Sequence, residues 1–344
     1  MNQRKSGRYE RYEFERSPWT QNLKQSDVAT LLGFTKTQLE ALIRDKETFI
    51  RRETKDINGK LRQLAVPIGK LRRCHEVLKY HLNKIRQPDY LFSPRKGRSQ
   101  RDNAARHVGQ NQFLKVDVCK FYPSTSGEHI FRWAYHVAGL RSDVAGLLKH
   151  LVAIDDRMPF GSPVSPILIS LVHRPMFDQV FAASARCGVL MSLWVDNLVL
   201  SGPSVPGALL REIRDIIRGN GFQTHDIRFQ EASRPVTITG VPIEDGRVVA
   251  PRSVHQRVKD GYVALRAANT DSDRLVATDV LLSNLGTYRY LVGSTTLEGR
   301  KTADRMNVLR RRRAQLAPIF ITRPSTPLAV TPLMVIERGD TAPF

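Results

Sequence analysis

The sequence predicts an α+β fold, in which antiparallel strands near the middle of the chain are followed by a helical C-terminal region. Residues 190–200 contain two apolar, β-prone runs on either side of the dipeptide Asp196-Asn197. A turn-forming pair between such runs is typical of a β-hairpin. Residues 113–118 form a second strand-like run, and residues 221–227 and 236–240 are expected to be the closing strands of the same sheet. Residues 252–318 are expected to form helices. The hairpin would hold the Asp196 carboxylate at its tip, on buried strands.

The charge of the chain points to a polyanionic partner. Its 344 residues can bury a substantial core, as one multi-lobed unit or as two to three subdomains. Lys and Arg number 54 against 33 Asp and Glu, which leaves a formal net charge of +21. Residues 51–106 hold 16 basic and 5 acidic residues, an excess of 11. Such clustering favours attraction to phosphates over a merely basic surface.

The cysteines and the apolar runs indicate a reducing, non-membrane environment. Cys74, Cys119 and Cys187 are far apart, with no CxxC or Cys/His zinc spacing, so we expect reduced core residues. The first residues lack the apolar region of a signal peptide. The longest apolar run, Ile167–Val172, is too short to cross a bilayer. We therefore expect a cytoplasmic protein with no membrane partner.

The N-terminal third is expected to contain helices around one hairpin. Residues 1–48 predict a helical extension, with one helix ending at Gly33 and the next beginning at Thr35. We expect this extension to pack against the next lobe rather than to have a separate binding function. Residues 49–67 predict two strands, whose charged residues would by themselves be a solvated face. Residues 68–85 have apolar positions at helical spacing with basic residues between them.

Two carboxylates are the candidate metal ligands. Asp117 lies near the end of the strand-like run that precedes the aromatic pair Phe121-Tyr122, and Asp196 lies in the predicted hairpin. Carboxylates on adjacent strands can share two divalent ions about 4 Å apart, as phosphoryl transfer requires. Either Asp alone is more often an ordinary turn residue. Between them, residues 158–170 form a Gly-Ser-Pro-x-Ser-Pro loop that leads into an apolar helix and offers hydroxyls beside a nucleotide-sized space.

In this order and spacing, the three stretches resemble motifs A, B and C of the reverse transcriptase palm. More narrowly, they are similar to retron and defence-associated bacterial reverse transcriptases. The resemblance implies a right-hand polymerase fold with fingers, a palm built on an antiparallel sheet, and a helical thumb. The expected regions are an N-terminal extension at 1–48, a fingers-rich region at 49–112, the palm at 113–250, the thumb at 251–320 and a C-terminal tail at 321–344.

The same resemblance implies an RNA-directed DNA polymerase site. Asp117, Asp196 and Asn197 would be catalytic, and Asp117, Val118 and Asp196 would hold two Mg²⁺ ions, for which Mn²⁺ could substitute. The usual Tyr-x-Asp-Asp is Trp-Val-Asp-Asn here, and Asn is a weaker ligand for hard metals than a carboxylate. Three alternatives stay open: an active polymerase, a decayed palm that only binds nucleic acid, and a template-independent nucleotidyltransferase.

Five residues are expected at the nucleotide. By resemblance Lys55 and Arg62 contact the triphosphate, and Tyr122, five residues past Asp117, lies under the sugar and excludes a ribose 2′-hydroxyl. Phe160 stands where the family has Gln, beside Gly161. This replacement removes a hydrogen-bonding side chain near the nucleotide and the template base.

The remaining expectations concern nucleic acid and partners. Residues 95–107 form a basic Gly/Ser-containing loop in which we expect backbone contacts. The predicted nucleic-acid-binding residues are Arg95, Lys96, Arg98, Arg101, Arg310 and Arg311. Asn103 and His107 are expected to form a hydrogen-bonded pair that braces the palm. Arg228 is the nearest cation to the position of the family's motif D lysine, which is not clearly present.

The resemblance also implies partners and a wider role. The implied partners are a structured non-coding RNA template, an RNA–DNA duplex and dNTPs, with an effector protein or a second copy of the chain as a further partner. The implied role is antiphage defence in a bacterium.

Overall fold

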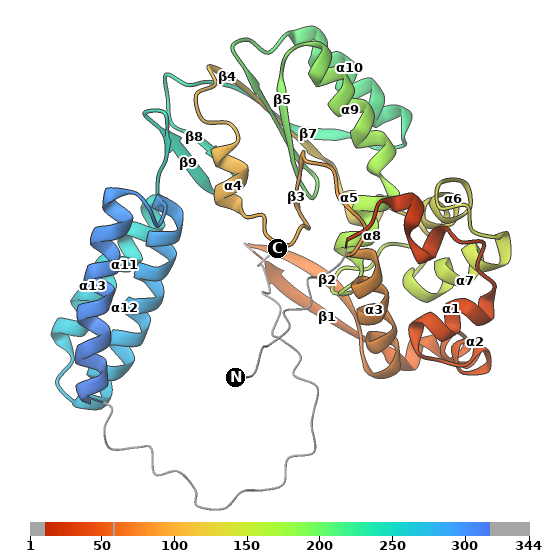
Figure 1. Ribbon diagram of the computed structural model, residues 1–344, viewed down its shortest axis with the longest axis horizontal. Coiled ribbons are helices and arrows are strands. Elements are labelled where there is room, and N and C mark those ends of the chain that lie inside the picture. The colour runs from red at the N-terminus through yellow and green to blue at the C-terminus, as the bar shows by residue number, and fades with distance from the viewer. Residues whose placement is uncertain (1–10, 58, 317–344) are drawn as a thin grey trace, which may run out of the picture. The chain divides into compact units, whose positions relative to one another are not determined.

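The computed structural model describes residues 11–316 except Asn58, and it divides into two units (Figure 1). The first unit ends at Thr239 and the second begins at Gly240. The C-terminal tail expected at 321–344 lies outside the described residues. Each unit is described by itself below.

A five-stranded sheet is the centre of the first unit, with strand order β3-β5-β6-β4-β7. Its strands are β3 (Leu91–Ser93), β4 (Gln112–Val118), β5 (Leu190–Trp194), β6 (Asn197–Gly202) and β7 (Thr224–Glu231). β3 pairs with β5 in parallel, and the other neighbours are antiparallel. The predicted hairpin at 190–200 and the strand at 113–118 are therefore present, as is the predicted mixture of helices and antiparallel strands.

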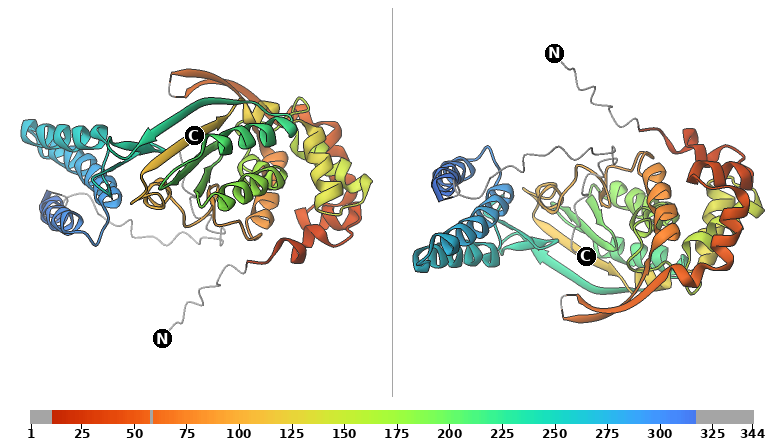
Figure 2. Two further views of the ribbon diagram at one scale, coloured as in Figure 1. Left: turned by 90° about the horizontal axis from the view of Figure 1, so that it is seen from above. Right: turned by 90° about the horizontal axis from the view of Figure 1, so that it is seen from below.

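Two long helices, α9 (Arg174–Arg186) and α10 (Gly207–Gly219), lie side by side against this sheet (Figures 1 and 2). In α10 the buried residues Leu209, Ile213 and Ile217 repeat every four positions, which gives one apolar face. The helix after the Gly-Ser-Pro loop, α8 (Ser165–Val172), is almost wholly buried. Two shorter helices, α4 (Gln100–Ala105) and α5 (Phe121–Ser124), follow β3 and β4.

The N-terminal helices join the same hydrophobic core. They are α1 (Gln25–Leu32), α2 (Lys36–Arg44), α3 (Gly69–Leu82), α6 (Gly127–Arg132) and α7 (Ser142–Val152). Short helical turns are η1 (Phe14–Arg16), η2 (Pro18–Thr20), η3 (Lys46–Phe49) and η4 (Trp133–Val137). Gly33 ends α1 at a φ of 76°, and the Thr35 side chain caps α2. α1 contacts α3 and α7, so the extension packs on the adjoining lobe as predicted.

The predicted hairpin near the N-terminus consists of β1 (Ile50–Ile57) and β2 (Lys60–Pro67), paired antiparallel. Lys55 lies opposite Arg62 in this register. A backbone bond from Ala65 N to the Phe160 carbonyl, 2.9 Å long, joins β2 to the Gly-Ser-Pro loop. This bond brings one end of the hairpin to the candidate nucleotide site.

The second unit is mainly helical, in agreement with the prediction for residues 252–318. Its helices are α11 (Arg252–Ala267), α12 (Asp271–Val292) and α13 (Leu297–Leu316), preceded by the paired strands β9 (Val241–Glu244) and β10 (Arg247–Val248). Leu281, Leu285, Met306 and Leu309 form its core. A Cβ at Gly261 would lie 3.1 Å from Leu281 Cδ1, so glycine permits a close approach of α11 to α12.

Two sequence predictions about position need correction. β8 (Val236–Ile238) was expected to close the palm sheet, but it lies outside the five-stranded sheet, which ends at β7. Cys187 was expected in the core and is exposed, because it follows the C-terminal end of α9 at the surface; Cys74 alone is fully buried. No described helix is both long and apolar enough to span a membrane.

Candidate active site

The two candidate carboxylates come together at one end of the sheet. In the pairing of β4 with β6, Asp117 lies opposite Asn197. Val118 N donates a hydrogen bond to the backbone carbonyl of Asp196, 3.1 Å away. The turn between β5 and β6 consists of Val195 and Asp196 rather than the expected pair Asp196-Asn197, because Val195 adopts a left-handed φ of 59° and Asn197 begins β6. The sheet therefore holds both Asp residues on adjacent, hydrogen-bonded backbone.

The environment of Asp196 makes its negative charge costly. Burial raises the pKa of Asp196, and hydrogen bonds from its own backbone N–H and from Asn197, together with the charges of Arg62 and His225, oppose that rise only in part. The Asp117 side chain is 23% exposed, and its Oδ2 lies 4.0 Å from Nε2 of His225. A desolvated carboxylate beside a second one is stabilised by a bound cation.

The donor atoms present fit a divalent metal. The carboxylates of Asp117 and Asp196 and the backbone carbonyl of Val118 are hard oxygen donors of the kind that such ions prefer. Within the described part of the chain, no group of three or more His, Cys, Asp and Glu side chains is arranged to hold a metal. The side-chain nitrogen of Asn197 donates to Oδ1 of Asp196 at 3.0 Å. Asn197 thus acts here as a donor to Asp196.

An aromatic stack lies beside the carboxylates. The rings of Tyr122 and Phe160 stack with centroids 4.7 Å apart and an angle of 22° between their planes. The guanidinium carbon of Arg62 lies 5.2 Å from the Phe160 centroid, within cation–π range. Tyr122 is 6% exposed, and its hydroxyl has no hydrogen-bond partner among the described residues. Burial raises the pKa of that hydroxyl, so it stays neutral.

The loop that carries Phe160 is fixed from two sides. Gly161 has a φ of 96°, and a Cβ there would lie 2.8 Å from Val66 Cγ2, so only glycine fits beside β2. His75 Nε2 donates to the Leu151 carbonyl at 2.9 Å, which leaves Nδ1 to accept from the Ser162 hydroxyl at 2.7 Å. Burial lowers the pKa of His75 to about 4. A neutral histidine on α3 therefore braces this loop.

Lys55, the remaining residue predicted to contact the nucleotide, is exposed on β1. Its partner in the hairpin, Arg62, reaches Phe160 and contributes to the electrostatics of Asp196. Of the two basic residues predicted to contact a triphosphate, the structure thus brings Arg62 to the carboxylate site.

The predicted nucleic-acid loop mixes structural and exposed cations. The Arg95 side chain is 15% exposed and donates to the Pro88 carbonyl and to Asp89, whereas Arg98 lies 3.7 Å from the same carboxylate. Lys96 is exposed and Arg101 is half-buried. Both Arg310 and Arg311 are exposed on α13 of the second unit.

His107 braces the palm, as predicted. Its ring nitrogens lie 2.6 Å from the Ser201 hydroxyl on β6 and 2.7 Å from the Ser192 hydroxyl on β5. Asn103 instead donates to Thr239 at 3.4 Å, so the two residues do not pair with each other. Arg228, the nearest candidate for a motif D cation, forms an ion pair with Asp226.

Sequence reasoning missed His225 at the carboxylate site. It lies opposite Asp117 in the pairing of β4 with β7, where the register shifts between Lys115 and Asp117. A lone histidine more than a hundred residues from its partner carries no sequence signal. The stack of Phe160 on Tyr122 was also missed, although both residues were assigned separately to the nucleotide.

Comparisons with known proteins agree with this geometry. The family model described as "Reverse transcriptase (RNA-dependent DNA polymerase)" matches residues 44–243. Retron Ec86 reverse transcriptase of Escherichia coli is 25% identical over 154 residues, which cover 44% of this chain and 48% of that protein. Retron Mx65 reverse transcriptase of Myxococcus xanthus is 25% identical over 206 residues, which cover 51% and 48%. The matched region therefore spans about half the length of these relatives.

Among solved structures, apo telomerase from Candida tropicalis aligns with a TM-score of 0.49 and 12% sequence identity, over 77% of this chain and 56% of that one. The retron matches confirm the resemblance that the three motifs indicate, and the family match confirms the right-hand polymerase class. Because the family model covers more than half of the chain, including both carboxylates and the loop between them, the chain belongs to the reverse transcriptase (RNA-dependent DNA polymerase) family.

Proposed function

We propose that this protein is a retron-type RNA-directed DNA polymerase that copies a structured non-coding RNA with dNTPs. One observation carries the proposal: Asp117 and Asp196 lie on hydrogen-bonded strands, joined by the bond from Val118 N to the Asp196 carbonyl. Family membership and the names of the retron relatives support the reaction and the kind of template.

In this proposal Asp117, Val118 and Asp196 hold two Mg²⁺ ions, or Mn²⁺ in their place. When bound, the ions would activate the primer hydroxyl and neutralise charge on the reacting phosphates. Arg62 supplies a further positive charge toward the triphosphate, held in place by the Phe160 ring. Lys55 would approach the same phosphates from the neighbouring strand.

The aromatic stack would set the choice of sugar. The ring of Tyr122 is fixed by Phe160 and lies at the start of α5, directly after the strand that carries Asp117. Because the ring is held in this way, it could not move aside to make room for a ribose 2′-hydroxyl. Gly161 and the brace from His75 to Ser162 keep the Phe160 loop in position.

The wider role is proposed from the retron relatives. It comprises a cognate RNA held as template, an RNA–DNA duplex as product, an effector protein or a second copy of the chain as partner, and antiviral defence in a bacterial cytoplasm. Arg98, Arg101, Arg310 and Arg311 would contribute contacts to the nucleic-acid backbone.

One observation favours a second candidate, a palm that binds nucleic acid without catalysis. Asn197 replaces the second carboxylate of the motif and donates to Asp196 rather than adding charge. A template-independent nucleotidyltransferase would use the same two carboxylates without reading a template. These alternatives differ in measurable products.

The test is incorporation of labelled dNTPs by the full-length protein, with and without an RNA template annealed to a primer. We expect template-dependent DNA synthesis by the wild type, and none by Asp117→Asn, whose RNA affinity and thermal unfolding should match the wild type. Full activity of Asp117→Asn would refute the assignment of this carboxylate. Equal dNTP incorporation with and without the RNA template would support the template-independent nucleotidyltransferase. RNA binding without any incorporation would support the decayed palm.

A further inference from the structure

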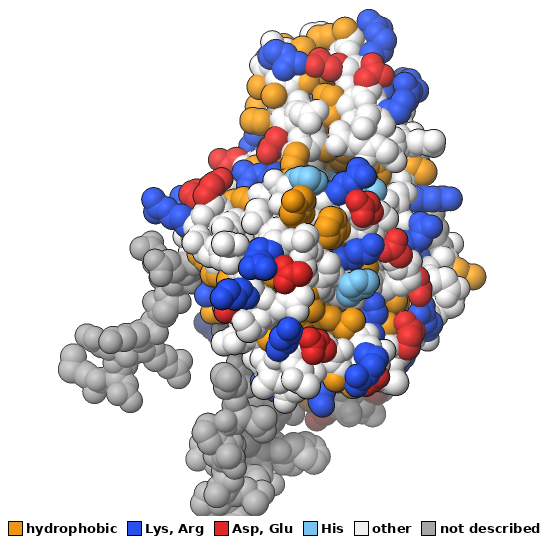
Figure 3. Space-filling view, turned by 90° about the vertical axis from the view of Figure 1, so that its right-hand side faces the viewer, with side chains coloured by type: hydrophobic (Ala, Val, Ile, Leu, Met, Phe, Trp, Pro, Cys, Tyr) orange, Lys and Arg blue, Asp and Glu red, His pale blue; other side chains and the backbone are white. Residues whose placement is uncertain are grey.

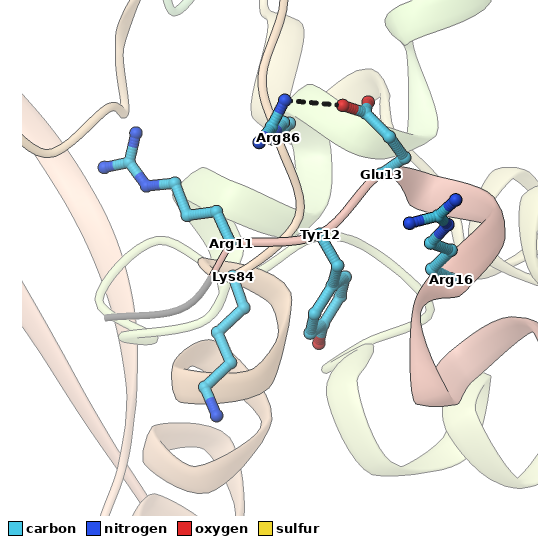
Figure 4. A pocket seen from close by; sticks show the side chains of 6 residues that line it. All are labelled: Arg11, Tyr12, Glu13, Arg16, Lys84 and Arg86. Atoms are coloured by element: carbon cyan, nitrogen blue, oxygen red, sulfur yellow. Dashed lines mark hydrogen bonds and ion pairs between the residues drawn. The ribbon is translucent and has the colours of Figure 1, made fainter. Parts of the chain in front are cut away.

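A second charged surface lies where the N-terminal segment crosses the end of α3 (Figure 4). Tyr12 forms a parallel bridge with Ile85: Tyr12 N donates to the Lys84 carbonyl at 3.0 Å, and Arg86 N donates to the Tyr12 carbonyl at 2.9 Å. The Tyr12 hydroxyl donates to the His81 carbonyl at 3.1 Å. The segment is therefore fixed in place on the rest of the first unit.

This anchoring exposes charged neighbours. Successive side chains of an extended segment point to opposite sides, so Tyr12 packs on the core while Arg11 and Glu13 stay at the surface. Figure 4 shows Glu13 and Arg86 directed toward each other, with Arg11 and Arg16 on either side of them. Two adjoining cavities, of about 380 and 480 Å³, share Arg11, Glu13 and Arg86 in their walls.

The lining of these cavities is strongly positive. Six basic residues line them against two acidic ones, Glu13 and Asp89, which leaves a formal charge of +4. The basic residues, which we call the basic groove, are Arg11, Arg16, Lys84, Arg86, Arg95 and Arg174. By contrast, basic and acidic side chains alternate over the face drawn in Figure 3, as on an ordinary solvated surface.

Internal ion pairs do not use up this charge. Glu13 accepts from Arg86 at 2.9 Å, and Asp89 accepts from Arg95 at 3.3 Å. Arg174 is paired with Asp178, 3.4 Å away. Arg11 and Arg16 are exposed, and neither has an acidic partner within the described part of the chain. Among the described residues, Arg11 donates to the Lys96 carbonyl at 3.4 Å, which links the groove to the basic loop that begins at Arg95. Two guanidinium groups thus remain to bind an external anion.

We propose that the basic groove binds the phosphate backbone of the template RNA outside the polymerase site. The inference rests on the proposed function, which supplies an RNA partner. Guanidinium groups form directional, charge-assisted hydrogen bonds with phosphates. The walls are charged rather than apolar, which suits a backbone and disfavours a small molecule that must be enclosed. Two joined cavities offer room for successive phosphates of one strand.

The groove is connected to the catalytic sheet through the chain itself. From Pro88, which lines the second cavity, the chain runs into β3. Ser93 at the end of β3 accepts a hydrogen bond from Val195 N at 3.1 Å, immediately before Asp196. The wall of the groove therefore continues into β3, the edge strand that is bonded to the active-site hairpin. RNA bound in the groove would contact a segment that leads directly to this edge of the sheet.

The test uses the full-length double variant Arg11→Gln/Arg16→Gln. The matched control is Arg211→Gln/Arg214→Gln on α10, which removes two exposed arginines that also lack an acidic partner among the described residues. The dissociation constant of a single-stranded RNA of about 30 nucleotides is measured by fluorescence anisotropy from 50 to 200 mM salt. Circular dichroism melts check folding in each variant.

The association constant falls as salt rises, and losing two phosphate contacts should make the slope of its logarithm against log salt shallower by about 1.4. Binding at 100 mM salt should weaken about twentyfold. The control should match the wild type, and Arg11→Lys/Arg16→Lys should recover most of the slope because the charges return. Equal slopes in the groove variant and the wild type would overturn the proposal.

Two further measurements separate the alternatives. Direct binding of polyglutamate tests an acidic protein as the true partner: if the groove variant loses affinity for polyglutamate but keeps the wild-type affinity for RNA, the RNA assignment is wrong. The slope is an equilibrium binding quantity, so it is read in Asp117→Asn as well. Failure of the polymerase proposal would appear as absent dNTP incorporation by the wild type, whereas failure of the groove proposal would appear as unchanged slopes.

Discussion

The side-chain amide of Asn197 donates a hydrogen bond to Oδ1 of Asp196, with nitrogen and oxygen 3.0 Å apart. The bond lowers the pKa of Asp196, against the larger effect of burial, which raises it. Asn197 therefore stabilises the charged form of its neighbour without adding charge to the site. A metal ion at this site would meet two carboxylates and one neutral amide.

The first prediction concerns Asn197→Asp. This change removes the hydrogen-bond donor and places a second carboxylate beside Asp196, which strengthens attraction for a divalent ion. We expect the Mg²⁺ concentration for half-maximal incorporation to fall about tenfold, which corresponds to about 1.4 kcal/mol, with a modest change in maximal rate. Mg²⁺ titrations of primer extension measure both quantities.

Two outcomes of that titration would contradict an active wild type. If wild-type protein stays inactive at every Mg²⁺ and Mn²⁺ concentration while Asn197→Asp extends primers, the natural palm is decayed. If both proteins are inactive on a verified RNA template, the polymerase proposal fails.

The second prediction concerns sugar choice. Tyr122→Ala should raise the use of ribonucleotides relative to deoxynucleotides, because it removes the ring that would meet a 2′-hydroxyl. Tyr122→Phe is the matched control: the hydroxyl has no hydrogen-bond partner among the described residues, so its loss should leave selectivity unchanged. Sugar selectivity is measured as the ratio of kcat/KM for a dNTP to kcat/KM for the matching rNTP, in the wild type and in both variants. Unchanged discrimination in Tyr122→Ala would make the ring a packing residue only.

The third prediction concerns Phe160, which lies between Tyr122 and Arg62. Phe160→Ala removes an aromatic stack and a cation–π contact, interactions worth about 0.5–1.5 kcal/mol each. We expect KM for dNTPs to rise about two- to tenfold, because Arg62 loses its support near the triphosphate. Phe160→Tyr keeps the ring and should retain a KM close to that of the wild type. A KM unaffected by Phe160→Ala would show that Arg62 is positioned by other contacts.

The fourth prediction concerns acid stability. Burial lowers the pKa of His75 to about 4 and those of His107 and His173 to about 3. Unfolding returns each to its ordinary pKa of about 6.5, so below that pH the unfolded state binds more protons. Each histidine should therefore reduce the free energy of unfolding by about 1.4 kcal/mol per pH unit as pH falls from about 6.5 toward its folded pKa.

Denaturant unfolding at pH 7, 6 and 5 measures this loss. In His107→Gln the free energy of unfolding should fall less steeply with pH, by the contribution of one histidine, about 1.4 kcal/mol per pH unit. NMR titration of the histidine rings supplies an independent check. A His107 ring that titrates near pH 6.5 in the folded protein would contradict the assignment.

Local patterns predicted the two hairpins, the helix that follows the first of them, and the segments that carry the two carboxylates. The two apolar, β-prone runs on either side of Asp196-Asn197 predicted the hairpin, and the helical spacing in 68–85 predicted α3. Asp117 and Asp196 were brought together only by the three-motif resemblance, since nothing in either segment specifies that β4 pairs with β6.

Contacts that depend on long-range packing could not be predicted. The sequence places Phe160 beside Gly161, but its stacking on Tyr122 depends on how the loop docks against β2. His225 reaches Asp117 only because β7 joins the sheet with a shifted register. The direction of the Asn197 amide, toward Asp196, is likewise a property of the folded turn.

The hydrogen bond from Ala65 N to the Phe160 carbonyl makes the Ala65 amide a probe of the contact between β2 and the loop that carries Phe160. This amide belongs to the hairpin strand β2, yet its acceptor belongs to the loop that carries Phe160, whose ring is proposed to lie beside the nucleotide. Its hydrogen–deuterium exchange therefore measures how often the hairpin separates from the loop. Exchange at Ala65 should slow when a matched dNTP is bound, so closure around the substrate can be timed without attaching a label.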